Sequence, residues 1–168
     1  MLLDPMLPEQ GLDWFEGGRR PERIVLTNRH HYRRSAEFVD AFGCAVLASE
    51  PGLHEFEGGP DVQGFAFGDE VAPGVTALEV GAICPDESAI LFPGGSLLAV
   101  ADGVIGENEL AFVPDSLLGD DPAEVRRGLR EAYGRICEQH EFDNLARAHG
   151  SPIVGGARET LREFVAPE

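Results

Sequence analysis

The chain has 168 residues, of which 43% are hydrophobic, and its 30 acidic and 13 basic side chains give a formal charge of −17. This length suits one domain over residues 1–168, and the hydrophobic content argues against a disordered protein. The charge argues against partners such as nucleic acid or anionic membranes, because both need a cationic surface.

The N-terminus and the cysteines predict a cytoplasmic protein. Residues Met1 to Pro5 lack the basic region of a signal peptide. No apolar run approaches the roughly 20 residues that span a bilayer. Cys44, Cys84 and Cys137 are an odd number without a short-spaced pair, which argues against a disulfide framework and a cysteine-type zinc site. We expect three buried thiols.

The first third of the chain predicts a β-α-β unit. A helix is expected over residues 8–16 and another from about Ser35 to Ala41, ending at Gly43. Short apolar runs predict strands at residues 2–4, 24–27 and 45–48. The second and third of these strands flank a helix, so they should run parallel.

The remaining two thirds alternate strand and loop patterns before a helical end. Strands are expected at residues 63–67, 75–80, 89–92, 97–101 and 142–146. Residues 69–74 are expected to form a turn, and Pro93 to Gly95 a hairpin connection. A long helix should follow Asp121, because Asp121 can cap it and Pro122 suits its first position. A closing helix is expected from Ala157 to Val165.

The polar turn after the strand at residues 24–27 contains the most reactive side chains. It follows the carboxyl end of that strand, where α/β proteins place their sites. The chain has no lysine and no arginine between Ser35 and Val125, yet arginines crowd this turn, at positions Arg19, Arg20, Arg23, Arg29, Arg33 and Arg34. These arginines either balance the acidic body of the protein or form a local pocket for an anionic ligand.

This turn resembles the metal-binding motif of the metallo-β-lactamase-fold hydrolases, Thr-His-x-His-x-Asp-His between a strand and a helix. Here the segment reads Thr27-Asn28-Arg29-His30-His31-Tyr32-Arg33, so only His30 keeps its ligand type. Further segments resemble the family in the same order, namely Leu2-Leu3-Asp4-Pro5, Gly74 to Ala82, Leu97 to Gly103 and Ala148 to Pro152. The resemblance implies an α/β fold, the αβ/βα sandwich of this family, shortened at its N-terminus. A sheet edge exposed by that shortening predicts a homodimer.

The resemblance also assigns roles to single residues. His30 would bind a first metal ion, Asp102 would bridge two ions, and His149 would bind the second. Ligands of the first ion would be lost at Asn28 and Ala82, and ligands of the second at Tyr32 and Arg33. Because a catalytic zinc site usually has three protein ligands, these losses predict a metal-poor site in which Arg33 pairs with Asp102.

Three functions remain open from the sequence. The favoured hypothesis is a ligand-binding or interaction protein without a cofactor, which has lost hydrolysis and takes a small anionic ligand. Its pocket would contain Asn28, His30, His31, Tyr32, Arg33, Asp102 and His149. The alternative is a hydrolase of ester, thioester or lactone bonds with one zinc, iron or manganese ion on His30, Asp102 and His149, assisted by His31 after a change of register. The third hypothesis is an oligomeric scaffold with a vestigial pocket.

Overall fold

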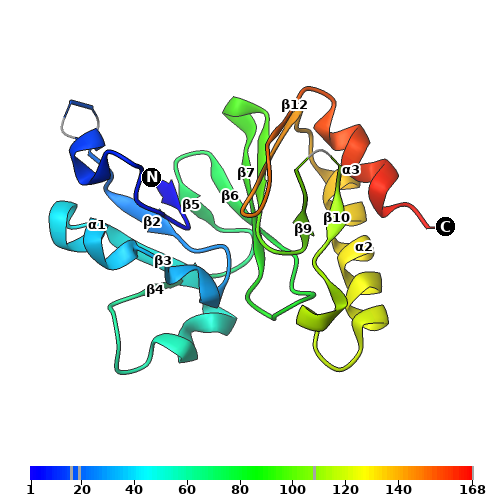
Figure 1. The fold of residues 1–168 in the computed structure, drawn as a ribbon, viewed down its shortest axis with the longest axis horizontal. Helices are drawn as coiled ribbons and strands as arrows, with labels where there is room; N and C mark the ends of the chain where they lie inside the picture. The colour runs from blue at the N-terminus through cyan, green and yellow to red at the C-terminus, as the bar shows by residue number, and fades with distance from the viewer. Residues whose placement is uncertain (16, 19, 108, 168) are drawn as a thin grey trace.

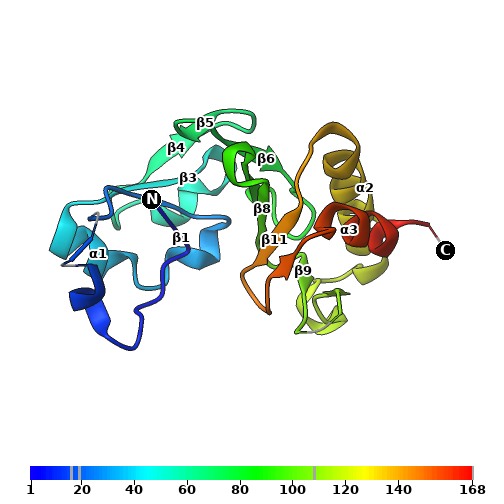
Figure 2. The same ribbon diagram turned by 90° about the horizontal axis from the view of Figure 1, so that it is seen from above.

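Two β-sheets face each other at the centre of the molecule, and helices cover their outer faces (Figure 1). The computed structural model describes residues 1–15, 17–18, 20–107 and 109–167. Helix α1 (Ser35–Phe42) lies outside the first sheet, while α2 (Pro122–Gln139) and α3 (Ala157–Val165) lie side by side outside the second (Figure 2). This arrangement is the predicted αβ/βα sandwich.

The first sheet contains four parallel strands in the order β1-β2-β3-β4. Their bounds are β1 Leu2–Leu3, β2 Arg23–Val25, β3 Ala45–Ser49 and β4 Gln63–Phe65. The parallel pairing of β2 and β3 around α1 is confirmed. Helix α1 ends as predicted, because Gly43 adopts a left-handed conformation and its N–H bonds to the Val39 carbonyl.

Short 3₁₀ turns replace or supplement predicted helices on this side. Residues Gly11–Phe15 form the turn η1 where an α-helix over residues 8–16 was predicted, and Glu16 and Arg19 lie outside the described residues. Residues Arg29–Tyr32 form the turn η2, and Glu50–Phe56 form η3. Runs this short keep the chain irregular between β2 and α1, so a few tertiary contacts can decide where each side chain of η2 points.

The second sheet has six strands in the order β12-β11-β8-β7-β6-β5. Their bounds are β5 Glu70–Ala72, β6 Val75–Glu79, β7 Ser88–Phe92, β8 Leu97–Val100, β11 Asn144–Arg147 and β12 Ile153–Val154. Strand β5 lies where a turn was predicted, and β12 was not predicted at all. Both strands lie at an edge of the sheet. Each adopts a strand conformation because it pairs with its neighbour in a hairpin, and its own sequence pattern does not predict this.

The connection from β8 to α2 contains small elements that its sequence did not predict. They are β9 (Val104–Ile105), β10 (Ala111–Phe112), which pairs with it, and the 3₁₀ turn η5 (Asp115–Leu117). The predicted hairpin between β7 and β8 is present, with the turn η4 (Pro93–Gly95) at its tip. Helix α2 begins as predicted, because the Asp121 carboxylate accepts a 2.9 Å hydrogen bond from the backbone N–H of Glu124.

In the described part of the chain, three hydrophobic clusters pack the layers against one another. One lies between the sheets and includes Val25, Phe65 and Ile90, while a second packs α1 against the first sheet. The largest packs α2 and α3 against the second sheet. Cys44 and Cys137 are buried as predicted and Cys84 is half-buried, and all three thiols are free. In the described part of the chain, no helix is both long and apolar enough to cross a membrane.

Candidate metal centre

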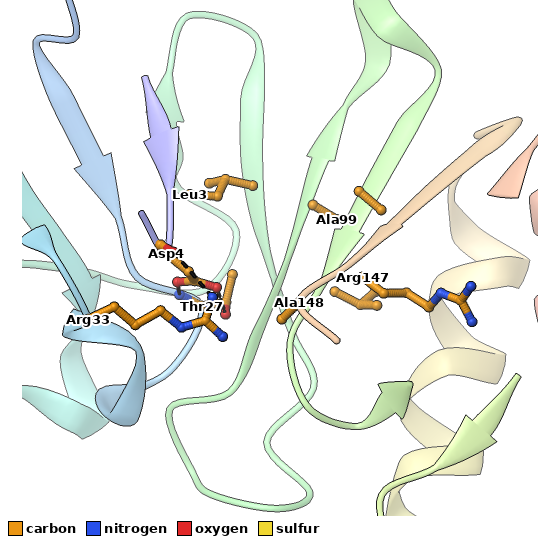
Figure 3. Close-up of a pocket in the computed structure, with 9 residues that line it drawn as sticks. Leu3, Asp4, Thr27, Arg33, Ala99, Arg147 and Ala148 are labelled. Atoms are coloured by element: carbon orange, nitrogen blue, oxygen red, sulfur yellow. Dashed lines mark hydrogen bonds between the residues drawn. The ribbon is translucent and has the colours of Figure 1, made fainter. Parts of the chain in front are cut away.

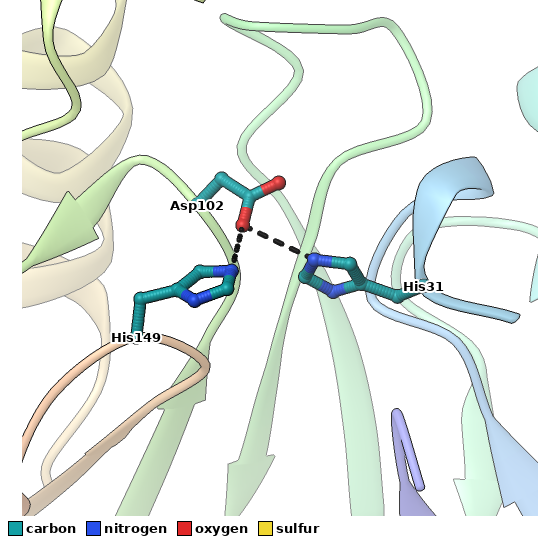
Figure 4. Close-up of side chains that lie close together, drawn as sticks. All are labelled: His31, Asp102 and His149. Carbon is teal, nitrogen blue, oxygen red and sulfur yellow. Dashed lines mark ion pairs between the residues drawn. The ribbon is translucent and has the colours of Figure 1, made fainter. Parts of the chain in front are cut away.

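Three side chains from loops at the carboxyl ends of strands meet in one place (Figure 4). The Nε2 atom of His31 and the Nε2 atom of His149 each lie 3.1 Å from Oδ1 of Asp102. His31 belongs to η2, Asp102 follows β8, and His149 follows β11. All three ligand atoms lie within 4.8 Å of one another. Two imidazole nitrogens and a carboxylate oxygen therefore lie close enough together to share one ion.

The ring of His31 is held from behind by Asp4. Oδ2 of Asp4 lies 2.9 Å from Nδ1 of His31, and the carboxylate also accepts bonds from the backbone N–H (2.8 Å) and the hydroxyl of Thr27. Since a carboxylate only accepts hydrogen bonds, the proton of this contact sits on Nδ1 of His31. This arrangement directs Nε2 towards Asp102 and is the usual support of a metal-binding histidine.

Asp102 is fixed in a similar way. The amide nitrogen of Asn28 donates a 2.9 Å hydrogen bond to Oδ2 of Asp102, which leaves Oδ1 facing the two rings. Behind it, the buried carboxylate of Glu87 accepts a 2.9 Å bond from the backbone N–H of Gly103. A side chain at Gly103 would collide with Tyr133 and Leu129, so glycine lets the turn lie directly on α2.

His149 is positioned by backbone contacts between two glycines. Gly106 and Gly150 form an isolated parallel bridge, and the N–H of Gly106 donates a 3.1 Å hydrogen bond to the carbonyl of His149. Both glycines have positive φ angles, 119° and 140°, which other residues rarely adopt. The bridge joins the loop after β9 to the loop after β11, so it brings His149 to Asp102.

Two carboxylates control the charge of His31. Burial lowers the pKa of His31, but the hydrogen bonds to Asp102 and Asp4 outweigh it and raise that pKa to about 9. Burial also raises the pKa of Asp102, yet the contacts with His31 and Asn28 leave it below its usual value. Without a metal ion, a proton on His31 therefore neutralises part of the negative charge at the centre.

The donor set fits one divalent ion. Ligand atoms bound tetrahedrally at 2.0 to 2.1 Å from zinc are about 3.3 Å apart, and the observed separations from Asp102 are 3.1 Å. Two imidazoles and one carboxylate suit zinc, iron and manganese, and three protein ligands leave an open position. The buried support from Asp4 and Asn28 keeps these atoms aimed at the site.

Neither a known family profile nor a curated protein sequence matches this chain. Several solved structures, in contrast, are similar to it. TTHA1623, described in a di-iron-bound form, is 22% identical, with a TM-score of 0.75 over 96% of this chain and 87% of its own. The metallo-β-lactamase family protein TTHA1429 from Thermus thermophilus is 15% identical, with a TM-score of 0.60 over 86% of this chain and 59% of its own. The archaeal superfamily member ST1585 from Sulfolobus tokodaii is 15% identical, with a TM-score of 0.65 over 99% of this chain and 76% of its own.

The chain has the metallo-β-lactamase fold. In this metallo-β-lactamase-fold protein, His31 rather than His30 lies beside Asp102 and His149. Asn28 caps η2 by accepting a 2.9 Å hydrogen bond from the backbone N–H of His30, and the side chain of His30 is exposed beside the neighbouring cleft. The structure therefore places His31, and not the expected His30, with Asp102 and His149, whereas the change of register considered from the sequence would have brought both histidines there.

Arg33 does not form the expected ion pair with Asp102 among the described residues. Its Nη2 atom instead lies 3.1 Å from Nε2 of His31 and 3.4 Å from Nε2 of His149, and its Nη1 atom donates to the Asp4 carbonyl. Its backbone has a φ of 45°, an unusual value for a residue with a side chain. The guanidinium faces the two nitrogens that a metal ion would use.

The other residues of the turn lie away from the centre. Tyr32 packs against Phe56 with ring centroids 6.1 Å apart and lines a different cavity. Arg29 clamps the buried Asp86, with a 2.6 Å hydrogen bond from Nε to Oδ1, and also pairs with Glu55. Arg29 therefore balances acidic groups, as one of the two interpretations of the arginine cluster predicted.

Proposed function

We propose that the protein is a hydrolase that holds one divalent metal ion through His31, Asp102 and His149. The observation that carries the proposal is the convergence of both Nε2 atoms on Oδ1 of Asp102 at 3.1 Å. A metal ion bound there would lower the pKa of a coordinated water and polarise a carbonyl group, which suits hydrolysis of ester, thioester or lactone bonds.

The residues behind the ligands have separate tasks in this proposal. Asp4, itself held by Thr27, keeps one proton of His31 on Nδ1, so that Nε2 is the nitrogen that would bind the ion after losing its own proton. Asn28 occupies Oδ2 of Asp102, so Oδ1 is the oxygen that remains for the ion. These contacts fix the ligand atoms before binding, which reduces the entropy lost when the ion arrives.

Arg33 supports a second candidate, the metal-free protein that binds a small anionic ligand. A guanidinium close to both imidazoles repels a divalent ion and competes for the nitrogen lone pairs. On its other side, Arg33 borders a cavity of about 250 Å³ with Asp4, Thr27 and Ala148, while Arg147 points its guanidinium away from that cavity (Figure 3). A single arginine at this cavity is weaker support than three converging ligands.

Elemental analysis of protein purified without a chelator separates the two candidates. We expect about one equivalent of zinc, iron or manganese per chain, and metal-dependent hydrolysis of 4-nitrophenyl acetate. His31→Gln and His149→Gln should each lose the ion. His30→Gln is the matched control, because this histidine is adjacent in sequence but outside the ligand group, and it should keep the ion.

Arg33→Gln completes the experiment. Removing the guanidinium should strengthen metal binding, because the variant has no permanent positive charge beside the two imidazoles. A wild-type protein with little metal at any of the three ligands, and no gain in Arg33→Gln, would reject the hydrolase and favour the anion-binding candidate.

A further inference from the structure

A cleft of about 520 Å³ opens beside the metal centre, and Asp102 and His149 form part of its wall. His30 also lines the cleft, and the remaining lining is apolar and comes from the loop after β6, from β9, from the segment leading into η5 and from η5 itself. Its apolar members are Ile83, Ile105, Val113, Pro114 and Leu117. Its volume lies in the range of small-molecule sites, about 300 to 1,000 Å³. A ligand in this cleft would place one end at Asp102 and the other among hydrocarbon side chains.

Leu117 shows that the apolar wall is not closed by the protein itself. Leu117 is 65% exposed, whereas Val113, which lines the same cleft, is only 8% exposed. Leaving a leucine in water costs free energy that an apolar ligand would recover. An exposed leucine in the lining of the cleft therefore favours a hydrocarbon group as the occupant.

The charges around the cleft argue against a polyanionic substrate. Among the described residues that line it, none is a lysine or an arginine, and Asp102 is an acid. The chain as a whole carries a charge of −17. A thioester carried on a phosphorylated leaving group would meet repulsion here, whereas a neutral ester or lactone would not.

We propose that this cleft binds the apolar acyl chain of a neutral ester or lactone, with the carbonyl carbon at Asp102 and His149. The proposal rests on the hydrolase function proposed above, and it assigns Leu117 and Val113 to chain recognition. The carbonyl end would then lie beside the proposed metal ligands, and the acyl chain would contact the apolar lining, which includes Ile105, Val113 and Leu117.

The test uses metal-free protein and ligands that cannot be hydrolysed, so it is independent of catalysis. Straight-chain methyl ketones from 2-hexanone to 2-decanone are titrated against protein carrying the neutral dye Nile red, and dye displacement is measured. We expect affinity to rise about two- to fourfold with each added CH₂ group until the cleft is filled. Coenzyme A, whose phosphate groups carry several negative charges, should not displace the dye at low salt.

Leu117→Asn and Val113→Thr should flatten the dependence on chain length. Val154→Asn is the matched control, because this valine is 81% exposed and lies on β12, outside the cleft. An affinity that does not change with chain length, displacement of the dye by coenzyme A, or a wild-type response in both cleft variants would overturn the proposal. If the ketones bind as expected but no metal is found, the hydrolase function fails while the apolar site stands.

Discussion

The orientation of the His31 ring depends on Asp4, 27 residues earlier in the chain. Asp4 directly follows β1 with a positive φ of 43°, is 7% exposed, and accepts hydrogen bonds from the backbone N–H and the hydroxyl of Thr27. A buried carboxylate needs such partners, and here Thr27 and His31 provide them. The pair Asp4 and His31 thus links strand β1 to the metal ligands through one hydrogen bond.

Asp4→Asn should weaken metal binding about 10- to 100-fold, because the neutral amide oxygen accepts the Nδ1 proton of His31 less strongly than a carboxylate and raises the basicity of Nε2 less. The measurement is competition for zinc with a chelating dye. Asp69→Asn, which changes a surface carboxylate that bonds to the N–H of Ala66, should bind zinc like the wild type. Wild-type zinc affinity in Asp4→Asn would show that the ring is held by other contacts.

At the scale of elements, the centre is assembled from loops of both sheets, because His31 follows β2 of the first sheet while Asp102 and His149 follow β8 and β11 of the second. Strands β8 and β11 are parallel neighbours, so Asp102 and His149 leave the same edge of the sheet. The bridge between Gly106 and Gly150 then joins the two following loops. The chain that follows Asp102 also carries Ile105, Val113 and Leu117 of the cleft, so a displacement of this segment would change both the candidate metal centre and the cleft.

Gly150→Ala should displace His149 and abolish most metal binding while the two sheets stay folded. The added methyl group would overlap with the carbonyl oxygen of Gly106, which is backbone and cannot turn away. Gly155→Ala is the control, because it shares a positive φ (81°) but its Cβ would meet no atom within 4 Å. The positive φ by itself costs about 1 to 2 kcal/mol. Equal metal affinity in the two variants would contradict a positioning role for the bridge.

At the scale of the whole molecule, two buried groups make the metal-free protein sensitive to pH. Burial raises the pKa of Glu87 to about 7, although hydrogen bonds from the backbone of Gly103 and Ile83 oppose this. A carboxyl group with a raised pKa binds more protons in the folded than in the unfolded state, so stability falls as the pH rises from about 4.5 to 7. The contacts of protonated His31, whose pKa is raised to about 9, contribute their full stabilisation of the folded state below about pH 6.5. This stabilisation is lost as the pH rises towards 9, because the imidazole then loses its proton.

Urea unfolding of metal-free protein should therefore show a free energy of unfolding that decreases from pH 5 to pH 9. Glu87→Gln should abolish the decrease in the free energy of unfolding that the wild type shows between about pH 4.5 and 7, a decrease of about 3 kcal/mol. Glu131→Gln, at an exposed position of α2, should follow the wild-type curve. A wild-type pH dependence in Glu87→Gln would assign the effect to other groups. The homodimer expected from the sequence stays a prediction.

The sequence by itself determined most of the elements that build the layers. The start of α2 followed from Asp121, Pro122 and Glu124, and the parallel pair β2 and β3 followed from the intervening helix. It also placed Asp102 at a strand end, because the apolar run 97–101 stops directly before it, whereas the position of His149 after a late strand came from the family resemblance. These features depend on residues close together in the chain, so local patterns are enough to predict them.

Only the tertiary structure decided which histidine joins the centre and what Arg33 contacts. His31 lies in a short 3₁₀ turn with a non-helical conformation (φ −98°, ψ 22°), so no periodicity tells which way its side chain points. The direction of the ring is fixed by Asp4 at Nδ1 and by Asp102 at Nε2, which both belong to other segments of the chain. Asn28, at the cap of the turn, holds the backbone of His30 and the carboxylate of Asp102 in place. Strands β5 and β12 were decided in the same way, because edge strands of two or three residues exist only through the neighbours that pair with them.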